Sequence, residues 1–420
     1  VEVAEHVAEL LPYYASVHRG AGYASRVCTA VLEHARETVA RFVGARPGED
    51  VVVFTRNTTD ALNLLARAVP GPVLYLDIEH HANLLAWHGT PHRVVRAADT
   101  LDRTLSELRA ALDTAPVALL AITGASNVTG EIVPLDTITE LAHQAGARVA
   151  VDAAQLAPHR TIDLAASGVD YLALSGHKLY APYGAGALMG RRDWLDRSPA
   201  HLAGGGAVRS VAVRTAEPVS HVAGTTDVTW LPAPHRHEGG TPNLIGAAAL
   251  AQACRVLERI RDATEAHERA LLNQLPRGLS ALPGVQALTI WPDSTERVAV
   301  SSFVVDGYDP GLVAAYLSAE HGIAVRDGRF CAHPLVDRLV GNRPGAVRAS
   351  LGLSTRACDI NRLLTALRAL LEHGPRWKYT QVDGRWVPVP DPRDLDPLRL
   401  GVAPISPPGC GDRPRPAAVW

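Results

Sequence analysis

The sequence lacks every feature that would place the protein in a membrane or stabilise it with disulfides. It contains no run of eighteen apolar residues and no signal-peptide pattern, so we expect a soluble protein. Its net charge of −2 argues against nucleic acid or an anionic membrane as a main partner. Its five cysteines lack the spacing of a disulfide framework, which fits a reducing, cytoplasmic compartment.

Composition and patterning predict two domains. A chain of 420 residues with 47% apolar content can bury a large core. Strand-like runs alternate with helical patterns from about residue 36 to 257, which predicts an α/β domain with a mostly parallel sheet between helices. We place this large domain at 1–257, a smaller α+β domain at 258–373, and an extension with a short hairpin and a proline-rich tail at 374–420.

A lysine and an aspartate stand where a pyridoxal phosphate ring needs them. The strand-like run Tyr171–Leu174 ends in Ser-Gly-His-Lys, and Lys178 follows Asp152 by the length of one helix and one strand. Lys178 could carry the aldehyde as a Schiff base, while Asp152 keeps the ring nitrogen charged and the ring an electron sink. A lone lysine at a strand end is usually a surface residue, so the interpretation depends on the neighbouring segments.

The segment around Thr58 predicts an anion site at a helix start. An apolar stripe at helical spacing follows it, from Ala61 to Ala68. Hydroxyls and free backbone N–H groups at a helix N-terminus suit a phosphate ester. By itself, this segment is more typical of an ordinary helix cap.

Histidines follow the strand-like run Val73–Leu76. His80 at a strand's carboxyl end can lie on an aromatic ring and move a proton. The pairs His80-His81 and His235/His237 could instead bind zinc. Adjacent residues rarely aim at one ion, and the chain has no Cys-x-x-Cys pair, so we expect no metal.

Two amides complete the candidate set. Asn127 follows the buried strand candidate Leu119–Thr123 and could donate to a substrate carboxylate or to a ring oxygen. Gln155 lies three residues after Asp152, so both can face one ligand as the chain turns into a helix. Carboxyl ends of parallel strands are where such folds bind ligands.

Together these segments resemble fold-type I pyridoxal-phosphate enzymes of the class V aminotransferase superfamily, in the cysteine desulfurase and selenocysteine lyase branch. The resemblance implies a seven-stranded sheet and a homodimer. The shared stretches run in family order to about residue 370. They are Val17–Gly20, Thr55–Thr59, Glu79–Asn83, Ser126–Val128, Asp152–Gln155, Ser175–Tyr180, Gly204–Gly206, Glu238–Asn243, Arg326–Leu335 and Arg348–Leu351.

The resemblance also implies a role for each matching residue. Lys178 would be the Schiff-base lysine, Asp152 the partner of the ring nitrogen and His80 the stacking residue. Arg348 would bind the substrate carboxylate, a role that suits its planar fork. The remaining ligands of cofactor or substrate would be Thr58, Thr59, Asn127, Gln155, Ser175, His177, Arg326 and, from the other subunit, Thr241.

Cys331 decides which reaction the sequence predicts. In the desulfurases that the chain resembles, the matching cysteine attacks the substrate sulfur and becomes a persulfide, which leaves alanine and can pass sulfur to an acceptor protein. Arg326, Arg329 and His333 are close in sequence, and positive charge favours a reactive thiolate. Alternatively Cys331 is a packing thiol, as we expect for Cys28, Cys254 and Cys358.

Two other functions stay open at this stage. One is a different pyridoxal-phosphate reaction on an amino acid, such as C–S β-elimination, transamination or epimerisation, with Cys331 not catalytic. The other is a non-catalytic scaffold, against which the intact Lys178 and Asp152 argue.

The chain departs from the desulfurase pattern in several places. Arg329-Phe330 stands where two histidines usually precede the cysteine. The stretch between Gly206 and Glu238 is longer and adds basic residues, and the chain continues beyond the family's usual end. It begins without methionine and without the segment that usually precedes the first helix, so we expect an incomplete N-terminus. None of these departures touches the cofactor residues.

Overall fold

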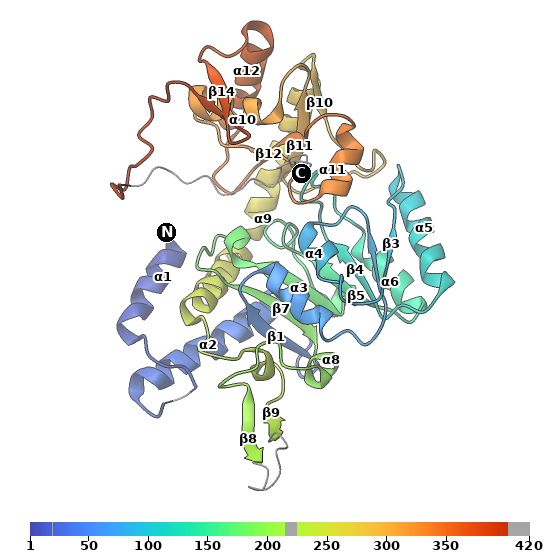
Figure 1. Cartoon of the computed structure of the whole chain (residues 1–420), viewed down its shortest axis with the longest axis vertical. Helices are drawn as coiled ribbons and strands as arrows, with labels where there is room; N and C mark the ends of the chain where they lie inside the picture. The colour runs from blue at the N-terminus through green and yellow to red at the C-terminus, as the bar shows by residue number, and fades with distance from the viewer. Residues whose placement is uncertain (19, 215–224, 402–420) are drawn as a thin grey trace, which may run out of the picture. The chain divides into compact units, whose positions relative to one another are not determined.

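A computed structural model describes residues 1–18, 20–214 and 225–401 (Figure 1). The chain divides into two compact units. The large unit comprises 1–98, 102–125 and 133–263, and the small unit comprises 99–101, 126–132 and the chain from 264 onward. In the described part of the chain, no helix is both long and apolar enough to cross a membrane.

The large unit contains a seven-stranded sheet in the order β1-β7-β6-β5-β4-β2-β3. Only β7 runs antiparallel to its neighbours, so the predicted mostly parallel α/β fold is confirmed. Its strands are β1 (Asp50–Thr55), β2 (Val73–Leu76), β3 (His92–Val95), β4 (Leu119–Thr123), β5 (Arg148–Asp152), β6 (Tyr171–Ser175) and β7 (Gly186–Arg191).

Apolar residues at helical spacing pack on this sheet. On α3, Leu62 and Leu65 are buried with Trp87 and with side chains of β1, β2 and β4. A second core joins α2 and α9 through residues such as Leu32 and Ala248. The helices are α1 (Glu2–Leu10), α2 (Tyr23–Phe42), α3 (Thr58–Ala66), α4 (His81–Leu85), α5 (Leu101–Thr114), α6 (Leu135–Gln144), α7 (Leu164–Ser167), α8 (Arg192–Arg197) and α9 (Leu244–Ser280).

Shorter elements complete the large unit. The long stretch after Gly206 forms a hairpin of β8 (Val208–Arg214) and β9 (Thr225–Trp230). The 3-10 turns are η1 (Leu11–Tyr13), η2 (Gly176–Leu179) and η3 (His235–His237).

The small unit is built on an antiparallel sheet in the order β10-β11-β13-β12. Phe303, Tyr316 and Leu367 are buried in its core together with leucines of the last turns of α9. Its elements are β10 (Val285–Ala287), β11 (Val300–Val305), α10 (Pro310–His321), β12 (Arg326–Gly328), α11 (His333–Val340), β13 (Ala346–Ser350) and α12 (Ala357–His373).

The C-terminal extension belongs to the small unit. Its predicted hairpin is confirmed as β14 (Tyr379–Val382) and β15 (Arg385–Pro388). The fully buried Glu320 carboxylate accepts hydrogen bonds from the Trp377 N–H at 3.0 Å and the Tyr379 hydroxyl at 3.1 Å, and pairs with Arg376 Nε at 3.0 Å. The predicted proline-rich tail lies outside the described residues from 402 onward.

Residues 126–132, which the sequence places in the large domain, also belong to the small unit. The cause is Glu131, whose buried carboxylate accepts hydrogen bonds from the Ile290 and Trp291 N–H groups, each at 2.8 Å, and from Arg297 at 3.1 Å. A side chain at Gly130, where φ is +80°, would come within 2.6 Å of two backbone oxygens. This long-range pairing has no local sequence signal.

Candidate functional site

The sheet of the large unit brings two candidate segments together. Gly186 at the start of β7 is the register partner of Thr55, the last residue of β1, and of Ser175, the last residue of β6. A Cβ at Gly186 would lie 2.6 Å from Asn57 Cα, so the chain after β1 passes directly over it. The segments that carry Thr58 and Lys178 therefore leave the sheet at the same end, on either side of β7.

The first turn of α3 has an unused donor where a phosphate is expected. Asn57 caps the helix, and its Oδ1 accepts a hydrogen bond from the Asp60 N–H at 3.0 Å. Thr58 Oγ1 is buried and has no hydrogen-bond partner among the described residues. Ser175 Oγ lies 2.8 Å from His177 Nδ1, which holds both groups at the end of β6. Hydroxyls and an N-terminal helical turn fit a phosphate ester.

Asp152 and Lys178 fit the ring of the same cofactor. Asp152 ends β5, is 4% exposed, and accepts a hydrogen bond from the Ala154 N–H at 3.0 Å. Burial raises the pKa of Asp152, and the charge of Lys178 acts against this shift. A buried carboxylate of this kind is stabilised by a cationic ring N–H, as pyridoxal phosphate would supply.

His80 precedes α4, and the adjacent Glu79 begins a series of hydrogen-bonded, buried side chains. His80 Nδ1 accepts a hydrogen bond from the Ala82 N–H at 3.0 Å, so the neutral ring carries its proton on Nε2. The adjacent Glu79 is fully buried and accepts a hydrogen bond from Asn83 Nδ2 at 2.7 Å, while Asn83 Oδ1 accepts one from Trp87 Nε1. Burial raises the pKa of Glu79 to about 8, which favours the neutral carboxyl. No role for Glu79 is predicted from the sequence.

Three predicted cofactor residues have more open positions. Gln155 lies in the turn after β5 and is partly exposed, whereas Thr59 on α3 and Thr241, just before α9, are exposed. Their cofactor contacts stay predictions.

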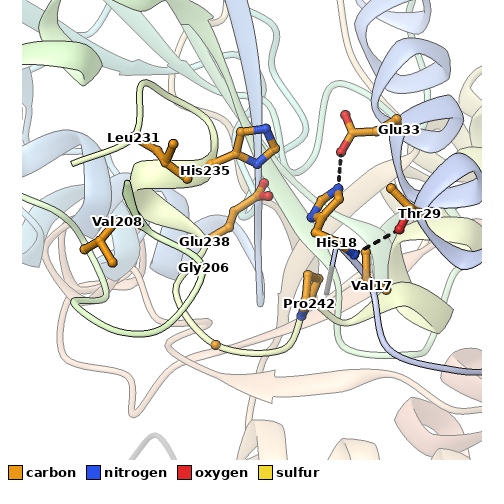
Figure 2. Close-up of a pocket in the computed structure, with 11 residues that line it drawn as sticks. Val17, His18, Thr29, Glu33, Gly206, Val208, Leu231, His235, Glu238 and Pro242 are labelled. Carbon is orange, nitrogen blue, oxygen red and sulfur yellow. Dashed lines mark hydrogen bonds and ion pairs between the residues drawn. The ribbon is translucent and has the colours of Figure 1, made fainter. Parts of the chain in front are cut away.

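Residues of three shared stretches line one cavity of the large unit. This cavity of about 670 Å³ lies between residues of Val17–Gly20, Gly204–Gly206 and Glu238–Asn243 (Figure 2). His18 Nε2 lies 3.0 Å from a Glu33 carboxylate oxygen, and Glu238 pairs with the buried Arg36 at 2.7 Å. Arg19 of the first stretch lies outside the described residues.

In the small unit, two arginines stand opposite each other. Arg326 on β12 is the register partner of Arg348 on β13, and like charges in this position destabilise a sheet. Arg348 Nη1 donates to the Asn127 carbonyl at 2.9 Å, while its buried Nε has no partner among the described residues. Burial and the charge of Arg326 lower the pKa of Arg348 to about 10. Such a pair favours an anionic ligand, for which a carboxylate is well shaped.

Cys331 lies on the loop between β12 and α11 in an unusual backbone conformation. Phe330 has φ +53° and Cys331 has φ +55°, and each left-handed residue other than glycine costs about 1 kcal/mol. Arg326 Nη2 donates to Cys331 Sγ at 3.3 Å. Arg329, also predicted near the thiol, is instead paired with Asp337 at 2.8 Å.

Asn127 and Phe330 have positions that the sequence does not reveal. The Asn127 side chain, predicted to meet substrate or cofactor, donates through Nδ2 to the Phe330 carbonyl at 2.8 Å. The Phe330 ring is fully buried and lies beneath the guanidinium of Arg348, 5.4 Å from its carbon. Both residues thus connect the cysteine loop to the arginine.

The other cysteines differ from one another. Cys28 and Cys254 are buried, as predicted, and burial raises the pKa of Cys254 to about 12. The prediction of a packing role is wrong for Cys358, which is exposed on α12. Cys410 lies outside the described residues.

One signal in the sequence supports Lys178 more strongly than its motif alone. Lys178 and Lys378 are the only lysines in the chain. A sequence that carries nearly all of its positive charge on arginine has a lysine in the turn after β6, where a Schiff base would require an amine that can lose its proton.

Comparison with known proteins agrees with this geometry. The family model "Aminotransferase class-V" matches residues 2–363. A cysteine desulfurase of Dickeya dadantii is 34% identical over 371 residues, which cover 85% of each chain. A probable cysteine desulfurase of Mycolicibacterium paratuberculosis is 35% identical over 86% of this chain, although the match spans only 52% of that longer protein.

Solved structures show the same relationship. An apo structure of the cysteine desulfurase from Thermococcus onnurineus NA1 has a TM-score of 0.77 and 32% identity, covering 88% of this chain and 91% of that one. The cysteine desulfurase CsdA from Escherichia coli, in an S-sulfonic acid form, has a TM-score of 0.73 and 30% identity over the same shares. The chain belongs to the aminotransferase class-V family of pyridoxal-phosphate enzymes.

Proposed function

We propose that this protein is a cysteine desulfurase, which converts L-cysteine to alanine and retains the sulfur as a persulfide on Cys331. The observation that carries the proposal is the arrangement of the small unit. There Arg326 stands opposite Arg348 and also donates to Cys331 Sγ at 3.3 Å. The arginine pair could bind the carboxylate of cysteine, and the Cys331 thiol, on the loop after β12, could attack its sulfur. The names of the relatives support the same reaction.

The large unit supplies the cofactor half of the reaction. Bound pyridoxal phosphate provides the electron sink that makes the substrate Cα proton removable. Lys178 would hold the cofactor covalently and then move the Cα proton. Its charge acts on Asp152, so the two residues are close together where β5 and β6 end. Asp152 would keep the ring nitrogen protonated, and the buried hydroxyl of Thr58 with Ser175 and His177 would hold the phosphate.

The small unit supplies the sulfur chemistry. The Cys331 thiolate attacks the substrate sulfur, so a bond forms between the two sulfur atoms while the substrate C–S bond breaks. The electron pair of the broken bond stays on the substrate carbon, which takes up a proton and becomes the methyl group of alanine. Cys331 is partly exposed, so an acceptor protein or a small thiol can remove the persulfide sulfur.

The proposal includes a homodimer. Thr241 lies exposed just before α9, which fits its expected role of reaching the phosphate bound by a second subunit. Replacing it with alanine should weaken cofactor binding while a dimer persists in analytical ultracentrifugation. A chain that is monomeric in the presence of cofactor would exclude this part of the proposal.

Product analysis tests the reaction. The cofactor-loaded protein is incubated with L-cysteine and a thiol reductant, and alanine, pyruvate and sulfide are measured separately. Alanine and sulfide in equal amounts, without pyruvate, are expected because the reductant releases the persulfide sulfur. Pyruvate in place of alanine would show β-elimination and overturn the desulfurase assignment.

A further inference from the structure

We propose that Phe330 is a positioning residue that fixes the Cys331 thiol relative to the guanidinium of Arg348. The proposal rests on the proposed function, because a desulfurase must engage the carboxylate and the sulfur of one substrate at the same time. Phe330 touches neither group of the substrate in this account. It acts through its two neighbours.

Three contacts join Asn127, Phe330 and Arg348 in a closed ring. The Asn127 side chain donates to the Phe330 carbonyl at 2.8 Å, and Arg348 Nη1 donates to the Asn127 carbonyl at 2.9 Å. The third contact is the guanidinium of Arg348 over the Phe330 ring, at 5.4 Å from its centroid, within the range of a cation–π interaction. Each of the three residues is therefore in contact with the other two.

The side chain of Phe330 anchors a loop that its backbone conformation does not favour. Of residues 326–331, Phe330 alone is fully buried. Phe330 and Cys331 both have left-handed φ values, which an exposed loop would not keep without an anchor. The turn is closed by the Ala332 N–H, which donates to the Arg329 carbonyl at 2.9 Å just before α11 begins. The buried ring and the hydrogen-bonded carbonyl of Phe330 thus determine the position of Sγ in the next residue, Cys331.

The position of Arg348 depends on the same ring. Its Nε is buried without a partner among the described residues, and its Nη1 is held by a single backbone carbonyl. The flat face of Phe330 supports the guanidinium from one side. A smaller or non-aromatic side chain at 330 leaves the guanidinium free to turn away from the thiol.

The charge around the thiol can be measured in the cofactor-free protein. Cys331 is alkylated with negatively charged iodoacetate and, separately, with neutral iodoacetamide. The ratio of the iodoacetate rate to the iodoacetamide rate reports positive charge near Sγ. Peptide mass spectrometry distinguishes alkylation at Cys331 from alkylation at the exposed Cys358. We expect this ratio to be higher at Cys331 than at Cys358 in the unmodified chain. Phe330→Leu and the more size-conserving Phe330→Met should each lower the Cys331 ratio at least threefold and leave Cys358 unchanged.

The matched control is Phe303→Leu, because Phe303 is the other phenylalanine of the small unit and is also fully buried. It should lower the melting temperature without changing the Cys331 ratio. An unchanged ratio in folded Phe330→Leu and Phe330→Met would overturn the proposal. An equal fall in Phe303→Leu would also overturn it, because loosening of the whole unit would then explain the effect.

Turnover of L-cysteine gives a second, separable result. In the loaded enzyme Phe330→Leu should reduce kcat for alanine formation about tenfold, with KM raised less than threefold because Arg348 keeps its bond to Asn127. A rise in KM alone would contradict a role in placing the thiol. If the unmodified enzyme makes no alanine, the proposed function fails, and the alkylation ratios still decide whether Phe330 positions the two groups.

Discussion

The two units hold their candidate residues by different means. In the large unit the candidate cofactor residues Asp152 and Ser175 end buried strands, so hydrogen bonding within the sheet fixes their positions. In the small unit Cys331 lies on a loop with two successive left-handed residues, held by contacts of Phe330. The positions of the candidate cofactor residues thus depend on the sheet, whereas the position of the Cys331 thiol depends on a few side chains.

The two units also differ in how they bury an acidic side chain. Glu79 in the large unit is fully buried with one carboxylate oxygen lacking a partner, while Glu131 in the small unit is fully buried with four donors around it. The first is a neutral acid beside the candidate cofactor residues. The second is a structural anion that ties residues 126–132 to their unit.

The largest effect should come from removing the amine of the large unit. Lys178→Ala should reduce turnover by about a thousandfold, since it removes the group that transfers the Cα proton. In the unmodified enzyme, borohydride reduction followed by peptide mass spectrometry should find the cofactor mass on Lys178. Lys378 is the built-in control, because it is the other lysine of the chain. Cofactor mass on Lys378 instead would refute the assignment.

A smaller effect should follow from the arginines of the small unit. Arg348→Gln should lower kcat/KM for L-cysteine between about tenfold and a hundredfold, because a charge-assisted hydrogen bond to a carboxylate is worth roughly 1.5–3 kcal/mol. Arg326→Gln, at an exposed position, should lower it about fivefold or less. Steady-state kinetics on both variants would contradict this account if Arg326→Gln were the more damaging.

The last effect concerns stability and its pH dependence in the large unit rather than turnover. Unfolded Glu79 should titrate near 4.3, but burial raises its folded pKa to about 8. The folded protein therefore binds more protons between these values, so stability falls as pH rises from about 4 to 8. The stability of Glu79→Gln relative to the unmodified chain should rise by roughly 4 kcal/mol between pH 5 and pH 8.5. Urea unfolding of the cofactor-free proteins at the two pH values measures this change.

Glu131→Gln is the matched control for this prediction. It leaves Arg297 without its charged partner at 3.1 Å, so it should destabilise the small unit by about 3 kcal/mol. A stabilising effect of Glu131→Gln at pH 8.5 would show that the two buried acids do not differ as described.

What the sequence predicts follows the same division. We could infer the strands near Asp152 and Ser175, the helix start at Thr58 and the parallel sheet. Each strand or helix is marked in the sequence by a short apolar run or stripe with a polar residue next to it. The placement of residues 126–132 and the ring of contacts around Phe330 could not. They depend on strand register and on left-handed backbone angles at Phe330 and Cys331, which no short pattern encodes.

The most direct test of the account is alanine formation from L-cysteine by Cys331→Ser. Cys358→Ser serves as the matched control, since Cys358 is exposed on α12 and has no role in the account. We expect Cys331→Ser to make no measurable alanine while it still binds cofactor, and Cys358→Ser to be as active as the unmodified enzyme. Alanine formed by Cys331→Ser at an undiminished rate would contradict the central claim that this thiol accepts the sulfur.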